Sequence, residues 1–525
     1  MKARRFLAVV LAVTLLLLGL GAGAWWLVWQ RSPLQLQHRE LHPPRSARFV
    51  PRDAALSFYL LSDAEQPVAY ARAVAPPRQR RQAGEVISHL RDGAFAAAGL
   101  DYAGELASWL GEETGLWLLQ DPGRGAAGWV LALSSRDGDG ARRFLQRFWQ
   151  TRSLAGTELQ ISSYRGMGVI SGRGALLGRE PIPLATALID DDLVLLASGR
   201  GALEQALDVS QIDDLNQAAD PLLRRRLEAL GQGVALITAR PAALQRWLGA
   251  DLPDAAGSVV ASLRPQGQEL VLDGWLETMA GEALPPAGSA AAAGLLQALH
   301  GEAAELALVQ DPAHWPASWQ ALLRPLLGNA GQSEPGAVVP LLLEAADGPV
   351  LWRKGPEGWL LGSGPDHPNP AVVDASLRQL GLVAAPLEVE GDTLQAWTRL
   401  QAAPDQPRRA RAPGQLQASL AAARSLEGSW AWWSDSLEIL SAQHQGRSQP
   451  RALQARLQAL AMPAASLQWA GDGRPAQDLL QRWRGWRLFS ALAGEPLAEP
   501  VQGLALGLEP DGDALRLQVR LDYGA

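Results

Sequence analysis

The sequence predicts an α+β fold: two related halves of mainly antiparallel sheet with packed helices, preceded by one N-terminal transmembrane helix. Three observations predict this fold. The first is an uncharged apolar run over residues 6–29. The second is an irregular alternation of strand and helix patterns, with hairpin turns and no ordered strand–helix–strand series. The third is an internal repeat that aligns Pro265 with Pro510.

The expected anchor, residues 6–29, follows a basic head formed by residues 1–5. As a helix it would be roughly 36 Å long, more than the roughly 30 Å of a hydrocarbon core. Trp side chains at its end are typical of a membrane interface. Ala24 leaves open a signal peptide cleaved after that residue, but the apolar run continues to Trp29, which favours an uncleaved signal-anchor. We therefore expect a single-pass protein with a cytoplasmic N-terminus and its body in the periplasm or thylakoid lumen.

Composition divides the rest of the chain. Residues 30–47 contain several prolines and predict a stalk, and residues 48–280 form the expected first half. Residues 281–297, rich in Gly, Ala and Pro, predict a linker before the second half, residues 298–525. In the first half, apolar patterning predicts strands over 55–60, 114–119 and 128–133, helices over 85–98, 141–149 and 202–207, and short strands between 159 and 197.

The internal repeat rests on two pairs of segments. Residues 258–272 and 504–517 both show alternating strands around a Pro-x-Gly turn, which predicts a hairpin. Residues 53–60 also parallel residues 303–309. Each half is therefore expected to open with a strand and to close with a hairpin.

Several segments of the first half carry a family resemblance. They are Pro51–Leu56, Gly99–Tyr102 followed by Trp109–Glu113, and Tyr164–Gly166 leading to Leu188–Ser198. On these segments the chain resembles the cyanobacterial domain-of-unknown-function family 3352, clearly over residues 48–247 and loosely in the second half. The resemblance implies a membrane-anchored exported protein without an established activity, and it supplies no catalytic residue.

Composition and motifs exclude several functions. The chain has no Cys and a net charge of −7, which argues against thiolate chemistry and nucleic-acid binding. Lys2 and Lys354 are its only lysines, and neither belongs to a phosphate-binding loop. His38 and His42 have helical metal-ligand spacing but precede Pro43, so we interpret them as stalk residues. The run Asp190–Asp192 is interpreted as a hairpin turn, and we expect neither a catalytic residue nor a cofactor.

Tryptophan is the most unusual component, with 20 residues against seven Phe and five Tyr. One interpretation is that these rings fill the interface between the two halves. The other is that some contact a protein or a lipid, together with an exposed Arg-rich loop. The candidates for that contact are Trp315 and Trp319 on one helix face, Trp430 and Trp432 on one strand face, Trp483 and Trp486 beside arginines, and the loop residues Arg408, Arg409 and Arg411.

The function predicted from these features is that of a membrane-tethered extracytoplasmic binding or scaffold protein. Its expected partners are the membrane, through the N-terminal helix, and a protein or a lipid. An alternative is a carrier or sensor of lipid-like molecules, which requires an apolar cavity lined by Trp and Leu. A hydrolase with a non-standard site is the third hypothesis and requires carboxylates or His to converge in a cleft.

Overall fold

The structure is a computed structural model of the 525-residue chain. It describes residues 32–120, 128–154, 158–174, 182–249, 252–253, 255–323, 338–355, 357–389, 392–402, 416–446 and 449–524. The chain divides into two compact units. Unit 1 comprises Met1–Leu236, Ser262–Gln268 and Leu492–Glu495, and unit 2 comprises Ile237–Ala261, Glu269–Ala491 and Pro496–Ala525.

The predicted fold class is wrong in its N-terminal transmembrane helix. The described residues form a large antiparallel sheet of twenty strands with helices. No helix in the described part of the chain is both long and apolar enough to cross a membrane. The expected anchor itself, residues 6–29, lies outside the described residues.

Seven strands of unit 1 pair in the order β4-β5-β6-β7-β3-β2-β1, all antiparallel. The tight turn between β6 and β7 uses Asp190 and Asp191 with φ of 46° and 61°, a conformation that Asp tolerates. This confirms the hairpin turn expected there. The strands are β1 Leu56–Leu60, β2 Leu110–Leu118, β3 Trp129–Ser135, β4 Gln160–Tyr164, β5 Met167–Gly174, β6 Ile182–Ile189 and β7 Leu193–Ala197.

Helices cover this part of the sheet with aromatic side chains. Phe144 and Phe148 of α4 pack with Trp109 and with Leu131 and Leu133 of β3 in one buried cluster. The helices are α2 Gln66–Val74, α3 Arg80–Ala97, α4 Gly138–Leu154, α5 Arg200–Val209 and α6 Pro221–Leu230, with shorter helical turns η1 Pro33–His38, η2 Arg45–Phe49, η3 Tyr102–Leu106, η4 Asp213–Leu215 and η5 Gln217–Ala219.

The segment expected as a stalk contributes to the packing of unit 1. Ser46 and Ala47 of η2 are fully buried. The backbone N–H of Ser46 donates to Glu113 Oε1 at 2.8 Å, and its hydroxyl donates to the same oxygen at 2.5 Å. The chain before β1 is therefore held against β2 by hydrogen bonds.

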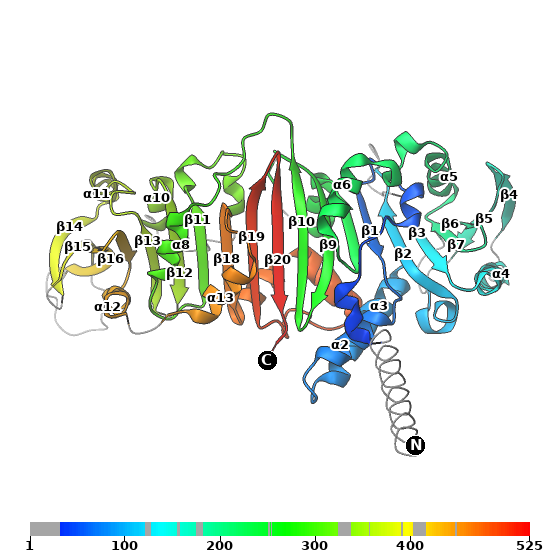
Figure 1. Cartoon of the computed structure of the whole chain (residues 1–525), viewed down its shortest axis with the longest axis horizontal. Coiled ribbons are helices and arrows are strands. Elements are labelled where there is room, and N and C mark those ends of the chain that lie inside the picture. The colour runs from blue at the N-terminus through cyan, green and yellow to red at the C-terminus, as the bar shows by residue number, and fades with distance from the viewer. Residues whose placement is uncertain are drawn as a thin grey trace, which may run out of the picture. The chain divides into compact units, whose positions relative to one another are not determined.

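The sheet of unit 2 runs in the order β14-β15-β16-β17-β13-β12-β11-β18-β19-β20-β10. Figure 1 shows its middle strands, from β12 through β11 and β18 to β10, lying side by side. The first seven positions repeat the order seen in unit 1 with every strand number raised by ten. The strands are β10 Glu269–Thr278, β11 Glu305–Gln310, β12 Pro349–Gly355, β13 Gly358–Ser363, β14 Val383–Val389, β15 Asp392–Ala402, β16 Leu416–Glu427, β17 Trp430–Ser434, β18 Leu467–Asp472, β19 Gly503–Asp511 and β20 Ala514–Asp522.

The core of unit 2 lies between its sheet and helices α8, α12 and α13. Leu295, Leu440 and Leu457 from these helices meet Leu306 of β11 and Leu351 of β12. The helices are α7 Pro241–Ala243, α8 Ala290–Gln297, α10 Val338–Glu344, α11 Pro370–Gln379, α12 Leu437–Gln445, α13 Arg451–Ala459, α14 Arg474–Arg482 and α15 Arg484–Ala493, with shorter turns η6 Leu244–Leu248, η7 Pro312–His314 and η8 Gln320–Leu322. Strands β8 Ala235–Ala239 and β9 Ala256–Gln266 contain residues of both units, and the last two residues of α15 belong to unit 1.

Candidate functional site

Asp311 stands directly after β11, where the chain turns sharply. Its φ of 47° places the backbone in the left-handed region. Pro312 then begins the short helix η7, because its fixed φ and missing N–H suit the first position of a helix. This turn directs His314 back toward the Asp311 side chain, and the two are hydrogen-bonded at 2.8 Å.

A second turn, residues 346–348, lies against the first one just before β12. The Asp311 N–H donates to the Gly348 carbonyl at 2.9 Å, and the Gly348 N–H donates to Asp311 Oδ1 at 3.2 Å. The Ala313 N–H donates to the Ala346 carbonyl at 3.2 Å. Since β11 and β12 are paired neighbours, these bonds place Asp347 opposite His314.

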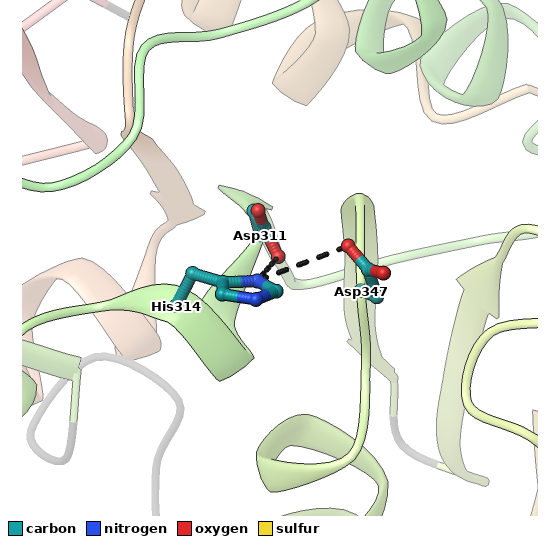
Figure 2. Close-up of side chains that lie close together, drawn as sticks. All are labelled: Asp311, His314 and Asp347. Atoms are coloured by element: carbon teal, nitrogen blue, oxygen red, sulfur yellow. Dashed lines mark hydrogen bonds and ion pairs between the residues drawn. The ribbon is translucent and has the colours of Figure 1, made fainter.

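Asp311, His314 and Asp347 form a cluster that we call the Asp–His cluster, and Figure 2 shows the three side chains facing one another. His314 Nδ1 lies 2.8 Å from Asp311 Oδ1 and 3.8 Å from Asp347 Oδ1. One ligand atom from each residue lies within 4.8 Å of the other two. The side chains of His314 and Asp347 are 64% and 54% exposed, and that of Asp311 is 20% exposed.

The charges in the cluster favour a cationic occupant. The hydrogen bond to Asp311 and then the charge of Asp311 raise the pKa of His314, and Asp347 adds to this effect against a desolvation cost. His367 Nδ1 lies 3.9 Å from the other carboxylate oxygen of Asp347. Among the described residues, the ion pairs recorded for Asp311 and Asp347 are with histidine rings alone. One imidazole nitrogen and two carboxylates can hold a proton or a divalent metal ion.

The structure places Trp315 and Trp319 inside unit 2 and not on one face of a helix. Trp315 follows η7, Trp319 precedes η8, and both side chains are buried. Their indole N–H groups donate to the carbonyl oxygens of Gln310 at 2.8 Å and Ala283 at 3.0 Å. These bonds fix the chain that leaves the Asp–His cluster.

Trp430 and Trp432 belong to β17, as the strand pattern predicted. Trp432 is fully buried in the core of unit 2, and Trp430 packs partly buried against the same core. The neighbouring Trp433 stacks on Trp397 of β15 with ring centroids 5.3 Å apart. The described contacts of these rings are therefore with the core.

Trp483 and Trp486 lie where α14 meets α15. They form an aromatic cluster with Phe489, with ring centroids 6.4–6.5 Å apart. Trp486 is buried, while Leu488 and Phe489 of α15 are exposed. The exposed residues Arg484, Arg487, Leu488 and Phe489 make up what we call the basic aromatic face.

The remaining positions singled out in the sequence contribute no further site. Arg408, Arg409 and Arg411 lie outside the described residues. Asp191 and Asp192 form ion pairs with Arg142 and Arg45 respectively. The His38 ring bonds to Gln37 at 2.9 Å.

A comparison with known families identifies the chain. The sequence model described as "Protein of unknown function (DUF3352)" matches residues 9–311, more than half of the chain. The chain belongs to this family. The match carries no information on a cyanobacterial source, which stays a prediction. No curated protein matches the chain.

The family match ends before most of the Asp–His cluster and before the basic aromatic face. It ends at Asp311, so His314, Asp347 and the basic aromatic face lie beyond the matched segment of this DUF3352 protein. The family match therefore cannot assign a role to these residues.

Solved structures that resemble the chain include crystal forms of one protein, TP0453. Crystal form III has 9% sequence identity, covers 46% of this chain and 82% of that chain, and gives a TM-score of 0.27. Crystal form I has 9% sequence identity, covers 46% of this chain and 81% of that chain, and gives a TM-score of 0.28. At these scores the resemblance carries no argument about fold or function.

The Asp–His cluster is a site that sequence patterns did not identify. Asp311 and His314 are three residues apart, a spacing that brings side chains together on a helical turn, and this was the available signal. No sequence motif contains His314 or His367. Asp347 joins them only because β11 pairs with β12.

Proposed function

We propose that this DUF3352 protein is a non-catalytic, extracytoplasmic binding protein that contacts an anionic membrane surface through the basic aromatic face of α15. The observation that carries the proposal is the exposure of Leu488 and Phe489 next to Arg484 and Arg487. Arg484, Arg487 and Leu488 stand at helix positions i, i+3 and i+4, so they share one side of α15. Basic residues beside exposed apolar and aromatic ones are typical of helices that lie in a membrane interface.

The anchoring of this face supports the proposal. Trp483 and Trp486 pack against Phe489 and hold its ring at the surface. Burying one large apolar side chain completely is worth about 1.5–3 kcal/mol, so Leu488 and Phe489, exposed by 47% and 36%, together supply about 1–2.5 kcal/mol. Each Arg near an anionic surface adds about 1 kcal/mol. Charge and apolar burial therefore contribute comparably, and contact should require anionic lipid.

The carrier hypothesis receives less support. One hollow of unit 2, about 200 Å³ in volume, is lined mainly by polar side chains, among them Gln395, Arg424 and His444. A second hollow, in unit 1, includes Arg52, Asp53 and Asp208 in its lining. Neither matches the apolar cavity lined by Trp and Leu that a lipid carrier requires. The hydrolase hypothesis required a cleft, and the Asp–His cluster lines neither of these hollows.

The absence of Cys from the sequence allows a direct test. An L488C variant of the full chain is labelled with a polarity-sensitive fluorophore and reconstituted into vesicles. The vesicles contain either equal parts of phosphatidylglycerol and phosphatidylcholine or phosphatidylcholine alone. We expect the fluorophore emission to shift to the blue with the anionic vesicles and to return when salt is added.

Two comparisons make the test specific. V372C, labelled on α11 at a residue 55% exposed against 47% for Leu488, should show no shift. Adding R484Q and R487Q to L488C should lower the equilibrium constant for bilayer contact roughly thirtyfold, from about 1 kcal/mol per Arg. The proposal would be refuted if the emission wavelength of the fluorophore at residue 488 did not change with either kind of vesicle, or if it shifted equally with both.

A further inference from the structure

The Asp–His cluster has the donor types of a transition-metal site. Imidazole nitrogen together with carboxylate oxygen suits zinc, nickel and cobalt ions, whereas magnesium and calcium prefer oxygen ligands alone. His314 supplies the nitrogen, and Asp311 and Asp347 supply the oxygens. All three come from segments bonded to each other, so the donors are already assembled.

The donor distances also fit. Ligand atoms bound to one zinc ion at about 2.0–2.2 Å in tetrahedral geometry lie about 3.4 Å apart. The separations from His314 Nδ1 are 2.8 Å to Asp311 Oδ1 and 3.8 Å to Asp347 Oδ1, on either side of that value. A small rotation of the exposed His314 ring would equalise them, because both oxygens lie toward the same nitrogen (Figure 2).

The Asp311 carboxylate is oriented by a hydrogen bond, and Asp347 lies between two imidazole rings. Asp311 Oδ1 accepts the Gly348 N–H, and its backbone is held by the Gly348 carbonyl. Asp347 Oδ2 lies 3.9 Å from His367, while its Oδ1 faces His314. Polar groups that orient ligand carboxylates in this way raise metal affinity.

The charge of the cluster is compatible with a dication. Asp374 of the same unit, by contrast, pairs with an arginine, Arg378, at 2.8 Å. For Asp311 and Asp347, the ion-pair partners in the described part of the chain are histidine rings and not arginines. A divalent ion would balance both negative charges.

We propose that Asp311, His314 and Asp347 form a binding site for one divalent transition-metal ion of the zinc class, with water completing the coordination. This site is separate from the basic aromatic face, and its occupancy does not depend on membrane contact. His367 is a positioning residue for Asp347 and not a ligand.

The test is calorimetric titration of the full-length protein with zinc chloride, and separately with magnesium chloride. We expect one zinc ion per chain and no saturable magnesium binding. D347N should weaken zinc binding at least tenfold, and H314A should abolish binding at this site. H367A should weaken it by less than D347N does. Far-UV circular dichroism and the metal-free melting temperature would establish that each variant is folded.

A matched control is available in His89. Its Nδ1 lies 2.9 Å from Glu495, as His314 lies from Asp311, but in the described part of the chain no second carboxylate pairs with it. H89A should bind zinc as the parent does. Cobalt provides an independent readout, because its visible absorption in the parent should change in H314A and not in H89A. The proposal is overturned if the parent binds no zinc, if magnesium binds equally well, or if H314A and D347N retain the parent affinity.

Discussion

Replacing Gly362 by Ala should destabilise unit 2, because the added methyl group meets the indole of Trp432. Gly362 of β13 pairs with Trp432 of β17. A Cβ at residue 362 would lie 2.8 Å from Cε3 and 3.0 Å from Cη2 of that ring, and closer still to Cζ3. Carbon atoms in good contact are about 3.5–4.0 Å apart. Trp432 is fully buried in the core, so its ring has no free space to move into.

Two opposing effects set the size of the change. Overpacking a core costs about 1–3 kcal/mol. Ala in place of Gly in a strand recovers about 0.5–1 kcal/mol of conformational entropy. The clash therefore dominates, and we expect G362A to lose about 1–2 kcal/mol of unfolding free energy. W432F removes the ring atoms that clash, but it leaves a cavity that costs about 1–3 kcal/mol by itself.

The assay is urea unfolding followed by far-UV circular dichroism, since W432F changes the fluorescence. At about 1–3 kcal/mol per molar urea, G362A should lower the midpoint by about 0.5–1 M. The double variant G362A/W432F should lose at least about 1 kcal/mol less than the sum of the single variants. G168A in β5 is the control, because its Cβ meets nothing within 4 Å, and it should not lower the midpoint. An unchanged midpoint for G362A, or strictly additive losses, would refute the reasoning.

Three further predictions concern buried polar groups. Burial raises the pKa of Glu305, so the folded state holds the proton more tightly than the unfolded state does. The folded state therefore loses stability as the pH rises through the raised pKa. E305Q removes the buried charge, so it should raise the melting temperature at about pH 7 more than at about pH 4. Arg456 binds two carboxylates at 2.5 and 2.6 Å in a largely buried position, so R456A should cost about 3 kcal/mol in urea unfolding. R142A removes an arginine whose ion pairs are exposed, so it should lower the unfolding midpoint far less. Tyr59 donates to Gln217 Oε1 at 2.8 Å inside unit 1, so Y59F should cost about 1–2 kcal/mol by the same measurement, and no loss would show that the bond contributes nothing.

Local patterns in the sequence were sufficient for several elements of the fold. The strand expected over residues 55–60 is confirmed by β1, and the helix expected over 141–149 lies within α4. Both depend on apolar periodicity, which neighbours in the chain determine. The helix expected to display Trp315 and Trp319 is wrong, because each indole N–H instead bonds a backbone carbonyl elsewhere in unit 2. Such hydrogen bonds are tertiary and leave no periodic trace in the sequence.

The Asp–His cluster was beyond the reach of sequence patterns for a related reason. Asp347 is far from His314 along the chain, and the pairing of β11 with β12 brings it close. Even the local pair Asp311 and His314 depends on a left-handed backbone at Asp311, a conformation uncommon for residues other than Gly. Strand register and one unusual dihedral angle therefore decide whether these side chains meet.

Two glycines of unit 2 make room for buried indole rings. Gly362 faces Trp432 across paired strands, and a Cβ at Gly471 would lie 2.6 Å from Cη2 of Trp469. Both rings are buried, and in the described part of the chain both indole N–H groups have no hydrogen-bond partner. These two tryptophans therefore contribute to packing of the core. The better candidate for a contact surface is α15, where aromatic and basic residues are exposed together.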